Sequence, residues 1–197
     1  MPLRAFEIEP HIDKPGTAIP PTNWYSSFAA ARLRNPEVHG PASYWLKVEG
    51  SFTRALQKQC ASSFHVEVQR EGFATPTLEE ARRLGIPFRQ LAWIREVRLC
   101  GDGKPLVLAR TVIPLACLKG EGRRLLNLGS KPLGAFLFSS RDWQRGPLET
   151  GLCTSSNRSS SKTGLPEPEL ARRSLFSNKE SALLVGEYLL PVLYRRS

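Results

Sequence analysis

The segment LAWIREVRLCGDGKPLVLARTVIP, residues 91–114, constrains the fold more than any other part of the chain. It consists of two runs rich in apolar and β-branched residues that meet at Gly101-Asp102-Gly103. An Asp-Gly step supplies the positive φ that a tight hairpin turn needs. The sequence therefore predicts two long antiparallel strands joined at this turn, and a sheet built around them.

Other segments add strands and short helices to this hairpin. FHVEVQREGF, residues 64–73, alternates apolar and polar side chains and predicts a half-buried strand. RRSLFSNKESALLVGEYLLP, residues 172–191, predicts a second hairpin with its turn near Asn178-Lys179. Helices are expected after the N-cap candidates Ser51 and Thr77, and in two pieces between residues 114 and 139. This pattern indicates an α+β fold with an antiparallel sheet covered by helices on one face.

The chain is long enough for one domain, which we expect to span residues 44–197. Residues 1–43 are rich in proline and predict an irregular N-terminal arm with a short helix in NWYSSFAAARLRN. Periodicity is lost after residue 141, and a Ser-rich loop is expected at about 153–166. No apolar stretch is long enough for a signal peptide or a membrane span.

Composition narrows the possible partners. The net charge of +10 indicates an anionic partner, which is a nucleic acid, a membrane surface or a small acidic ligand. No aromatic-rich RNA-binding signature accompanies the basic residues, so nucleic acid is not expected. We interpret the arginine doublets as a solvated basic surface; they are Arg82-Arg83, Arg123-Arg124, Arg172-Arg173 and Arg195-Arg196.

Neither cysteines nor histidines form a metal motif. The four cysteines include no C-x-x-C pair, so they are expected to be reduced thiols in a cytoplasmic protein. The three histidines are too widely scattered to predict a metal site, and His65 is expected to be solvated on its strand; they are His11, His39 and His65.

Two charged residues interrupt faces that are otherwise apolar. Side chains two apart on a strand share a face, so Arg95 lies with Trp93, Val97 and Leu99, and Glu187 lies with apolar residues of the last strand. A buried charge is costly unless it is paired. One interpretation is a buried Arg-Glu pair with no ligand, or an edge strand that leaves Glu187 in water. The other is a closed pocket for a small acid, in which Arg95 binds a carboxylate.

Four blocks of sequence, taken in order, resemble the chorismate pyruvate-lyase family of bacterial ubiquinone biosynthesis. They are REGF at 70–73, WIREVRLCGDGKPLVLARTVIP at 93–114, GSKPLGAFLF at 129–138 and GEYLLP at 186–191. The similarity covers about residues 44–144 and 171–194. The resemblance implies a single domain with about six antiparallel strands, and helical flaps over a buried ligand.

The resemblance also implies a reaction and a set of site residues. Chorismate would be converted to 4-hydroxybenzoate and pyruvate with no cofactor and no metal. Apart from the resemblance, we expect the protein to be a monomer. Arg95 would hold the ring carboxylate and Glu187 would meet the 4-oxygen of the ring. The backbone amide of Leu133 would help to bind the carboxylate, and Arg110 would be a further basic residue near the pocket. Phe52 departs from the family, because a methionine that binds through its backbone is expected there.

A different class of function competes with the enzyme. A non-catalytic domain of similar fold could sense a small acid, as in the effector-binding halves of some transcription regulators. Such regulators carry a helix-turn-helix domain, and the N-terminal arm is too short and irregular to form one. A third interpretation, an RNA-binding accessory protein, predicts nucleic-acid retention that falls steeply with salt.

Overall fold

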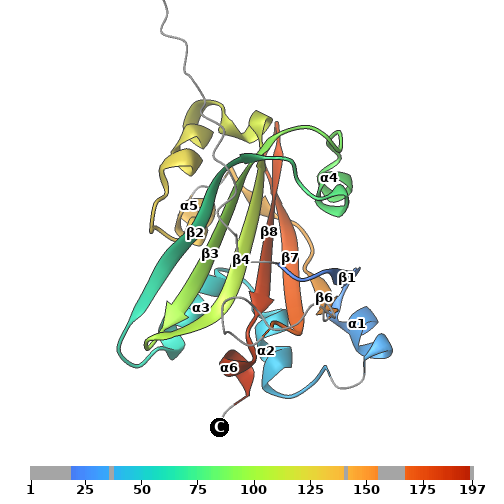
Figure 1. Ribbon diagram of the computed structural model, residues 1–197, viewed down its shortest axis with the longest axis vertical. Helices are drawn as coiled ribbons and strands as arrows, with labels where there is room; N and C mark the ends of the chain where they lie inside the picture. Colours follow the sequence, from blue (N-terminus) through green and yellow to red (C-terminus); the bar gives the residue numbers. More distant parts are fainter. Residues whose placement is uncertain (1–18, 36–37, 140–141, 155–166, 196–197) are drawn as a thin grey trace, which may run out of the picture.

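An antiparallel sheet organises the chain in the computed structural model, which describes residues 19–35, 38–139, 142–154 and 167–195 (Figure 1). Eight strands belong to it within these residues, in the order β1-β6-β7-β8-β4-β3-β2, with β5 paired to β7. The strands are β1 Thr22–Tyr25, β2 Phe64–Ala74, β3 Ala92–Gly101, β4 Lys104–Pro114, β5 Gln144–Arg145, β6 Glu149–Cys153, β7 Leu170–Ser177 and β8 Ala182–Leu189.

Both predicted hairpins are confirmed. The β3–β4 turn has Asp102 at φ 50° and Gly103 at φ 76°, which is the conformation that a two-residue hairpin loop requires. The β7–β8 turn is stabilised by Asn178, whose side-chain oxygen accepts hydrogen bonds from the backbone of Glu180 and Ser181. These turns place four long strands, β3, β4, β8 and β7, side by side at the centre of the sheet.

Asp102 also connects the hairpin tip to the segment that follows helix α3, Phe52–Gln59. Its carboxylate accepts the backbone N–H groups of Ala61, Ser62 and Ser63 at 2.8 to 3.0 Å. These bonds, that from Ala61 first, hold the pKa of the Asp102 carboxyl well below its usual range. The ionised Asp102 carboxylate therefore stabilises the fold fully above about pH 3.9, the pKa of this group in the unfolded chain. This stabilisation is lost progressively as the pH falls below that value.

Asp102→Asn should accordingly show a pH-dependent cost. Asparagine tolerates positive φ, so the variant removes the charge and keeps the turn. We expect the wild type to be more stable at about pH 6 and the difference to shrink at about pH 3, because the carboxyl is then largely protonated in the unfolded chain while it stays ionised in the folded one. Urea unfolding at both values measures this, and a difference that does not change with pH would contradict the assignment.

The sheet is larger than the six strands expected. The two shortest strands are the additional ones. Strand β1 lies inside the Pro-rich N-terminal segment and pairs with β6, and strand β5 pairs with β7. β6 also lies where no periodicity was seen. Strands of two to five residues contain too few positions to reveal a two-residue period. The short helix expected in the arm is confirmed as α1, Phe28–Arg34; His11 and most of the Ser-rich loop lie outside the described residues.

The helices begin and end largely where the sequence indicates. Ser51 caps α3, and Thr77 forms a capping box with Glu80 at the start of α4. Gly85 ends α4 in the left-handed conformation. The segment expected as two helical pieces consists of two 3₁₀ stretches and one α-helix. The remaining bounds are α2 Pro41–Lys47, α3 Phe52–Gln59, α4 Leu78–Leu84, η1 Leu115–Leu118, η2 Gly120–Asn127, α5 Leu133–Ser139 and α6 Pro191–Tyr194.

Most helices cover one face of the sheet, which we call the inner face and define by Arg95, Thr111 and Glu187. There α2 and α3 pack on the lower halves of the strands through Trp45, Leu46, Phe52 and Leu56, and the 3₁₀ stretches and α5 pack on the upper halves (Figure 1). The opposite, outer face carries Ile94, Glu96 and Arg110. Helix α4 packs on the outer face through Leu84, so the helices are not confined to one face as expected.

Candidate active site

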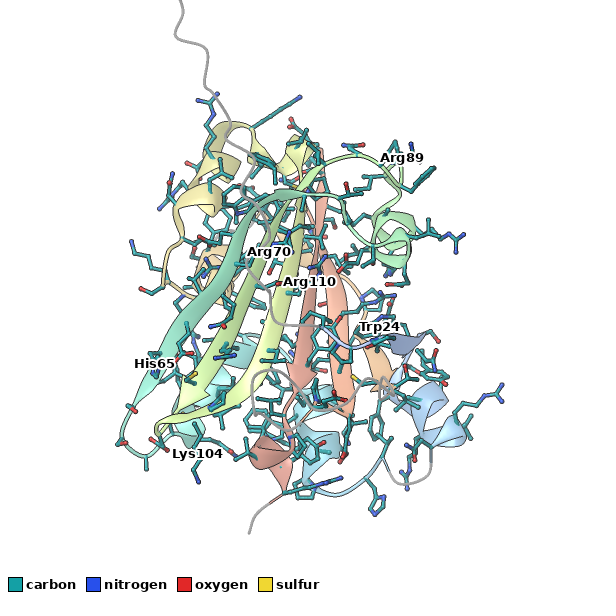
Figure 2. All side chains as sticks on the ribbon, in the orientation of Figure 1. Trp24, His65, Arg70, Arg89, Lys104 and Arg110 are labelled. Carbon is teal, nitrogen blue, oxygen red and sulfur yellow. The ribbon has the colours of Figure 1, made fainter. Side chains whose placement is uncertain are left out.

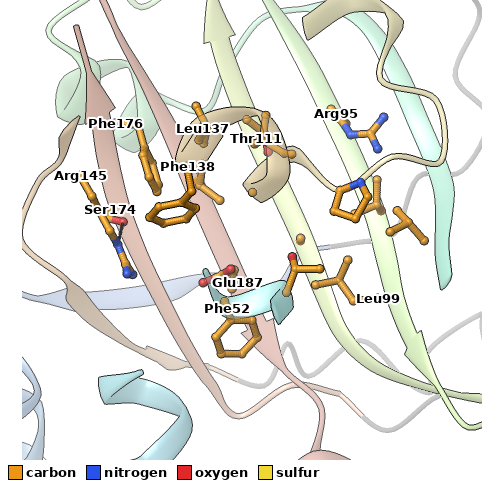
Figure 3. A pocket seen from close by; sticks show the side chains of 18 of the residues that line it. Phe52, Arg95, Leu99, Thr111, Leu137, Phe138, Arg145, Ser174, Phe176 and Glu187 are labelled. Carbon is orange, nitrogen blue, oxygen red and sulfur yellow. Dashed lines mark hydrogen bonds between the residues drawn. The ribbon is translucent and has the colours of Figure 1, made fainter. Parts of the chain in front are cut away.

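A pocket opens between the inner face of the sheet and the helices α3 and α5 (Figure 3). It encloses about 620 Å³ of space not occupied by atoms, including open solvent at its mouth. Its walls are mostly apolar, which is typical of small-molecule sites. The charged residues that line it are Arg95, Arg145, Arg172 and Glu187.

Strand register brings these charges to one face. Arg95 of β3 pairs with Thr111 of β4, and Ala109 of β4 pairs with Glu187 of β8. Glu187 in turn pairs with Arg172 of β7. Directly paired residues in an antiparallel sheet present their side chains on the same side. The positions of Arg95 and Glu187 on one face, predicted from the two-residue period, are thus observed.

Glu187 is partnered by a residue that sequence reasoning missed. Arg172 Nε donates to Glu187 Oε2 at 2.6 Å, and Arg172 Nη1 donates to the backbone oxygens of Trp45 and Val48 at 3.1 and 2.7 Å. The guanidinium also stacks on the ring of Phe52, 4.2 Å from its centroid. Arg172 is 1% exposed, so this network fixes the orientation of Glu187 from within the core.

The interpretation of the Arg172-Arg173 doublet as solvated surface was wrong. Consecutive strand residues point to opposite faces, and both faces of β7 are covered. Arg172 therefore enters the pocket side, whereas Arg173 lies on the outer face and pairs with Glu79 and Glu149 at 2.6 Å. The signal that could have revealed this is the position of the doublet at the start of an apolar hairpin strand.

Arg172→Ala should destabilise the fold strongly. The change leaves the Glu187 carboxylate and two backbone oxygens without their donor, and removing one partner of a buried ion pair costs ~3–5 kcal/mol. Urea unfolding of the variant measures the free energy. The double variant Arg172→Ala, Glu187→Gln should recover part of the loss, because it removes the uncompensated charge; no recovery would contradict a coupled pair.

Arg95 is buried and held by both a side chain and the backbone. It is 2% exposed, forms an ion pair with Glu71 of β2, and donates through Nη2 to the backbone oxygens of Gly129 and Lys131 at 2.7 and 3.3 Å. Burial lowers the pKa of the Arg95 guanidinium to about 10, so it remains charged at neutral pH. Arginine has five N–H donors and these bonds use three, so two remain for a ligand.

Leu133 and Phe52 both line the pocket. Leu133 is the first residue of α5, and the N–H of a first helical residue has no acceptor within its own helix. Phe52 begins α3, and its ring faces the pocket beside Glu187 (Figure 3). The backbone contacts expected at both positions remain predictions.

Arg110 lies on the other side of the sheet. It projects from the outer face of β4, near the middle of the sheet in Figure 2, and does not line the pocket. Its guanidinium bonds both oxygens of Glu80, at 2.7 and 3.0 Å, and Glu96 Oε1 at 2.5 Å. The structure therefore gives Arg110 a place in an ion-pair network and no contact with the pocket.

Among the residues that the structure describes, the pocket lining offers one carboxylate and neither an imidazole nor a thiol. In the described part of the chain, the group whose ligand atoms lie within 4.8 Å of one another is His65, Glu67 and Cys100. These residues lie on the outer face of β2 and β3, away from the pocket. The cysteines Cys60, Cys100, Cys117 and Cys153 are free thiols, and no described helix is long and apolar enough to cross a membrane.

Comparison with known proteins gives close relatives. A family model described as chorismate lyase matches residues 33–197. A protein of Marinobacter nauticus named "Probable chorismate pyruvate-lyase" is 64% identical over 195 residues, which are 99% of this chain and 97% of that protein. The "Chorismate pyruvate-lyase" of Pectobacterium atrosepticum is 35% identical over 147 residues, 75% of each chain.

Among solved structures, a GntR-family transcriptional regulator matches with a TM-score of 0.51 and 14% identity, covering 77% of this chain and 64% of that one. At this identity the likeness concerns the fold alone.

Proposed function

The chain belongs to the chorismate lyase family, and from that membership we propose that it converts chorismate into 4-hydroxybenzoate and pyruvate in the inner-face pocket. The observation that carries the proposal is the convergence of Arg95 and Glu187, from strands β3 and β8, on one largely apolar pocket. A direct Arg95-Glu187 ion pair, the alternative without a ligand, is not present, because Arg95 pairs with Glu71 and Glu187 pairs with Arg172. Both side chains nevertheless line the same pocket, and it is this pocket, together with family membership, that supports a ligand.

The substrate would bind with its ring carboxylate at Arg95. The two N–H donors that Arg95 retains and the backbone amide of Leu133 supply hydrogen bonds to this carboxylate. The ring would then extend along the apolar strands toward Glu187, which meets the 4-oxygen. Val97, Ala109 and Val185 provide apolar contact for the ring.

The reaction is a 1,2-elimination across two adjacent ring carbons. The bond between ring carbon 3 and the ether oxygen breaks, carbon 4 loses its hydrogen as a proton, and the ring becomes aromatic. The released enolpyruvate gains a proton on its methylene carbon and becomes pyruvate, so atoms and charge balance. Aromatisation supplies the driving force, and the protein mainly orients the substrate and stabilises developing charge. Glu187 either accepts the proton or holds the 4-hydroxyl by a hydrogen bond.

We also propose that the reaction needs no cofactor and serves ubiquinone biosynthesis. The two products together have the same overall oxidation state as chorismate. The elimination therefore requires no redox group. The donor set of the pocket, three arginines and one carboxylate, suits a small organic acid and is poor in metal ligands. The protein is expected to act on chorismate as a cytoplasmic monomer.

Genetic complementation tests the proposal. In a bacterium whose own chorismate lyase is deleted, the gene for this chain should restore ubiquinone, and added 4-hydroxybenzoate should do so without it. The Glu187→Gln gene serves as the control for expression without turnover. Rescue by 4-hydroxybenzoate but not by the expressed, folded wild type would contradict the proposal.

A further inference from the structure

We propose that Arg145 forms a second anion subsite, which binds the carboxylate of the enolpyruvyl side chain of the substrate. This inference rests on the proposed function and assigns a group to the second carboxylate of a dianionic substrate. Arg145 lies in β5, in a segment that the sequence pattern left without structure, and no role was predicted for it.

Two contacts hold the Arg145 side chain at the edge of the pocket. Nε donates to Ser174 Oγ at 2.9 Å and Nη1 donates to the backbone oxygen of Gly50 at 3.1 Å (Figure 3). The guanidinium carbon lies 5.9 Å from the centroid of the Phe176 ring. Arg145 thus links β7 to the loop between α2 and α3, and three of its five N–H donors remain for a ligand.

Arg145 differs from the other two arginines of the pocket in its charge balance. Arg95 pairs with Glu71 and Arg172 pairs with Glu187, whereas no described carboxylate lies within ion-pair distance of Arg145. A cation that is removed from water without a counter-ion favours the arrival of an anion. Burial first, and then the neighbouring Arg172, lower the pKa of Arg145 to about 10, against the opposing effects of Glu187 and Glu49, so the group is still charged at neutral pH.

The charge of the lining matches the substrate. Of the three arginines that line the pocket, Arg95 is paired with Glu71 and Arg172 with Glu187, so Arg145 is the lining cation without an ion-pair partner among the described residues. Chorismate carries two carboxylates, whereas 4-hydroxybenzoate carries one. When the ring carboxylate of chorismate binds Arg95, Arg145 remains as the cation available for the second carboxylate, on the enolpyruvyl side chain.

The positions of the residues agree with the shape of chorismate. Arg95 and Arg145 lie on opposite sides of the pocket with Glu187 between them (Figure 3). In chorismate the enolpyruvyl ether is on the ring carbon next to the hydroxyl-bearing one, and the ring carboxylate is at the other end of the ring. When the ring carboxylate contacts Arg95 and the 4-oxygen contacts Glu187, the side chain is therefore directed to the Arg145 end.

The subsite also contributes to the elimination. As the ether bond breaks, negative charge develops on the enolpyruvate that leaves, next to the carboxylate that Arg145 holds. A guanidinium fixed at this point stabilises the charge without reorganising. After proton transfer on its methylene carbon, the group leaves as pyruvate.

Steady-state kinetics of Arg145→Gln tests the subsite. Loss of a charge-assisted contact predicts a KM for chorismate raised on the order of 10- to 100-fold, with a lower kcat. The inhibition constant of 4-hydroxybenzoate should stay within roughly twofold of the wild-type value. This product lacks the enolpyruvyl side chain and so has no carboxylate at Arg145, and a substitution away from the groups that bind a ligand has a small effect on its affinity. Arg145→Lys should restore part of the chorismate affinity.

Arg98→Gln provides the matched control. Arg98 lies on the outer face of the sheet, makes one ion pair, with Glu67 at 3.8 Å, and its loss changes the net charge by the same amount. Chorismate and 4-hydroxybenzoate constants should both be unchanged in this variant. Any general effect of charge on substrate capture would appear in both variants, and an effect of the subsite only in Arg145→Gln.

Two results would overturn the subsite. An equal loss of affinity for chorismate and 4-hydroxybenzoate in Arg145→Gln would show that Arg145 only supports the pocket wall, and unchanged constants would place the second carboxylate elsewhere. Wild-type turnover reports on the proposed function separately. If the wild type does not turn over chorismate, calorimetric binding of chorismate and 4-hydroxybenzoate to the same variants gives the same comparison.

Discussion

Glu187→Gln is expected to lower kcat for chorismate on the order of 10²- to 10⁴-fold, the range that a positioned acid-base group contributes. The amide keeps the size of the side chain and can still hydrogen-bond the 4-oxygen, so the affinity for 4-hydroxybenzoate should change much less. Initial rates followed by the absorbance of 4-hydroxybenzoate, with product inhibition measured in parallel, separate the two effects.

Glu96→Gln is the control for this substitution. Glu96 is buried, belongs to the same sheet and pairs with an arginine, Arg110, but it points to the outer face. It should therefore reproduce any loss of stability from a neutralised buried glutamate without loss of turnover. Full activity in Glu187→Gln would show that this carboxylate has no catalytic role.

Arg95→Ala is expected to weaken substrate and product together. Both carry the ring carboxylate, and truncation of one partner of a buried charge pair costs ~2–5 kcal/mol, or roughly 30-fold to several thousand-fold in affinity. Calorimetry with 4-hydroxybenzoate and kinetics with chorismate should show losses of similar size. This parallel loss distinguishes Arg95 from Arg145, for which only chorismate should be affected.

Arg110→Gln tests the outer face of the sheet by the same kinetic measurements with chorismate. Its guanidinium bonds Glu80 and Glu96 and does not line the pocket, so the variant should lose stability and keep its KM within roughly twofold. A KM for chorismate that rises as far as in Arg95→Ala would contradict the placement of Arg110 outside the site.

The β3–β4 register explains why Arg95 could be placed from sequence while Arg110 could not. Near the turn Gly101 pairs with Lys104 and Cys100 with Pro105, a register that, if continued, would pair Arg95 with Arg110 on one face. An irregularity between Leu99 and Cys100 shifts the register by one, so that Arg95 pairs with Thr111 and Arg110 with Glu96. A bulge moves every later side chain of one strand to the other face relative to its partner, and no local pattern marked this one.

The sequence pattern did not reveal two of the pocket arginines, Arg172 and Arg145, and the reason differs between them. Arg172 belongs to a strand covered on both faces, where alternation of apolar and polar residues disappears and a charged doublet resembles a surface. Arg145 belongs to a two-residue strand that exists only because β7 is beside it. The long hairpins follow from local turn chemistry and periodicity, whereas these short or doubly covered segments depend on tertiary contacts that the sequence pattern does not contain.

The most direct test of the central claim is the conversion of chorismate by the purified, chelator-treated wild-type chain, with both products quantified. We expect 4-hydroxybenzoate and pyruvate in equal amounts, formed at a rate that Glu187→Gln sharply reduces. Tight binding of chorismate without either product would contradict the lyase and favour a small-acid sensor that shares the fold.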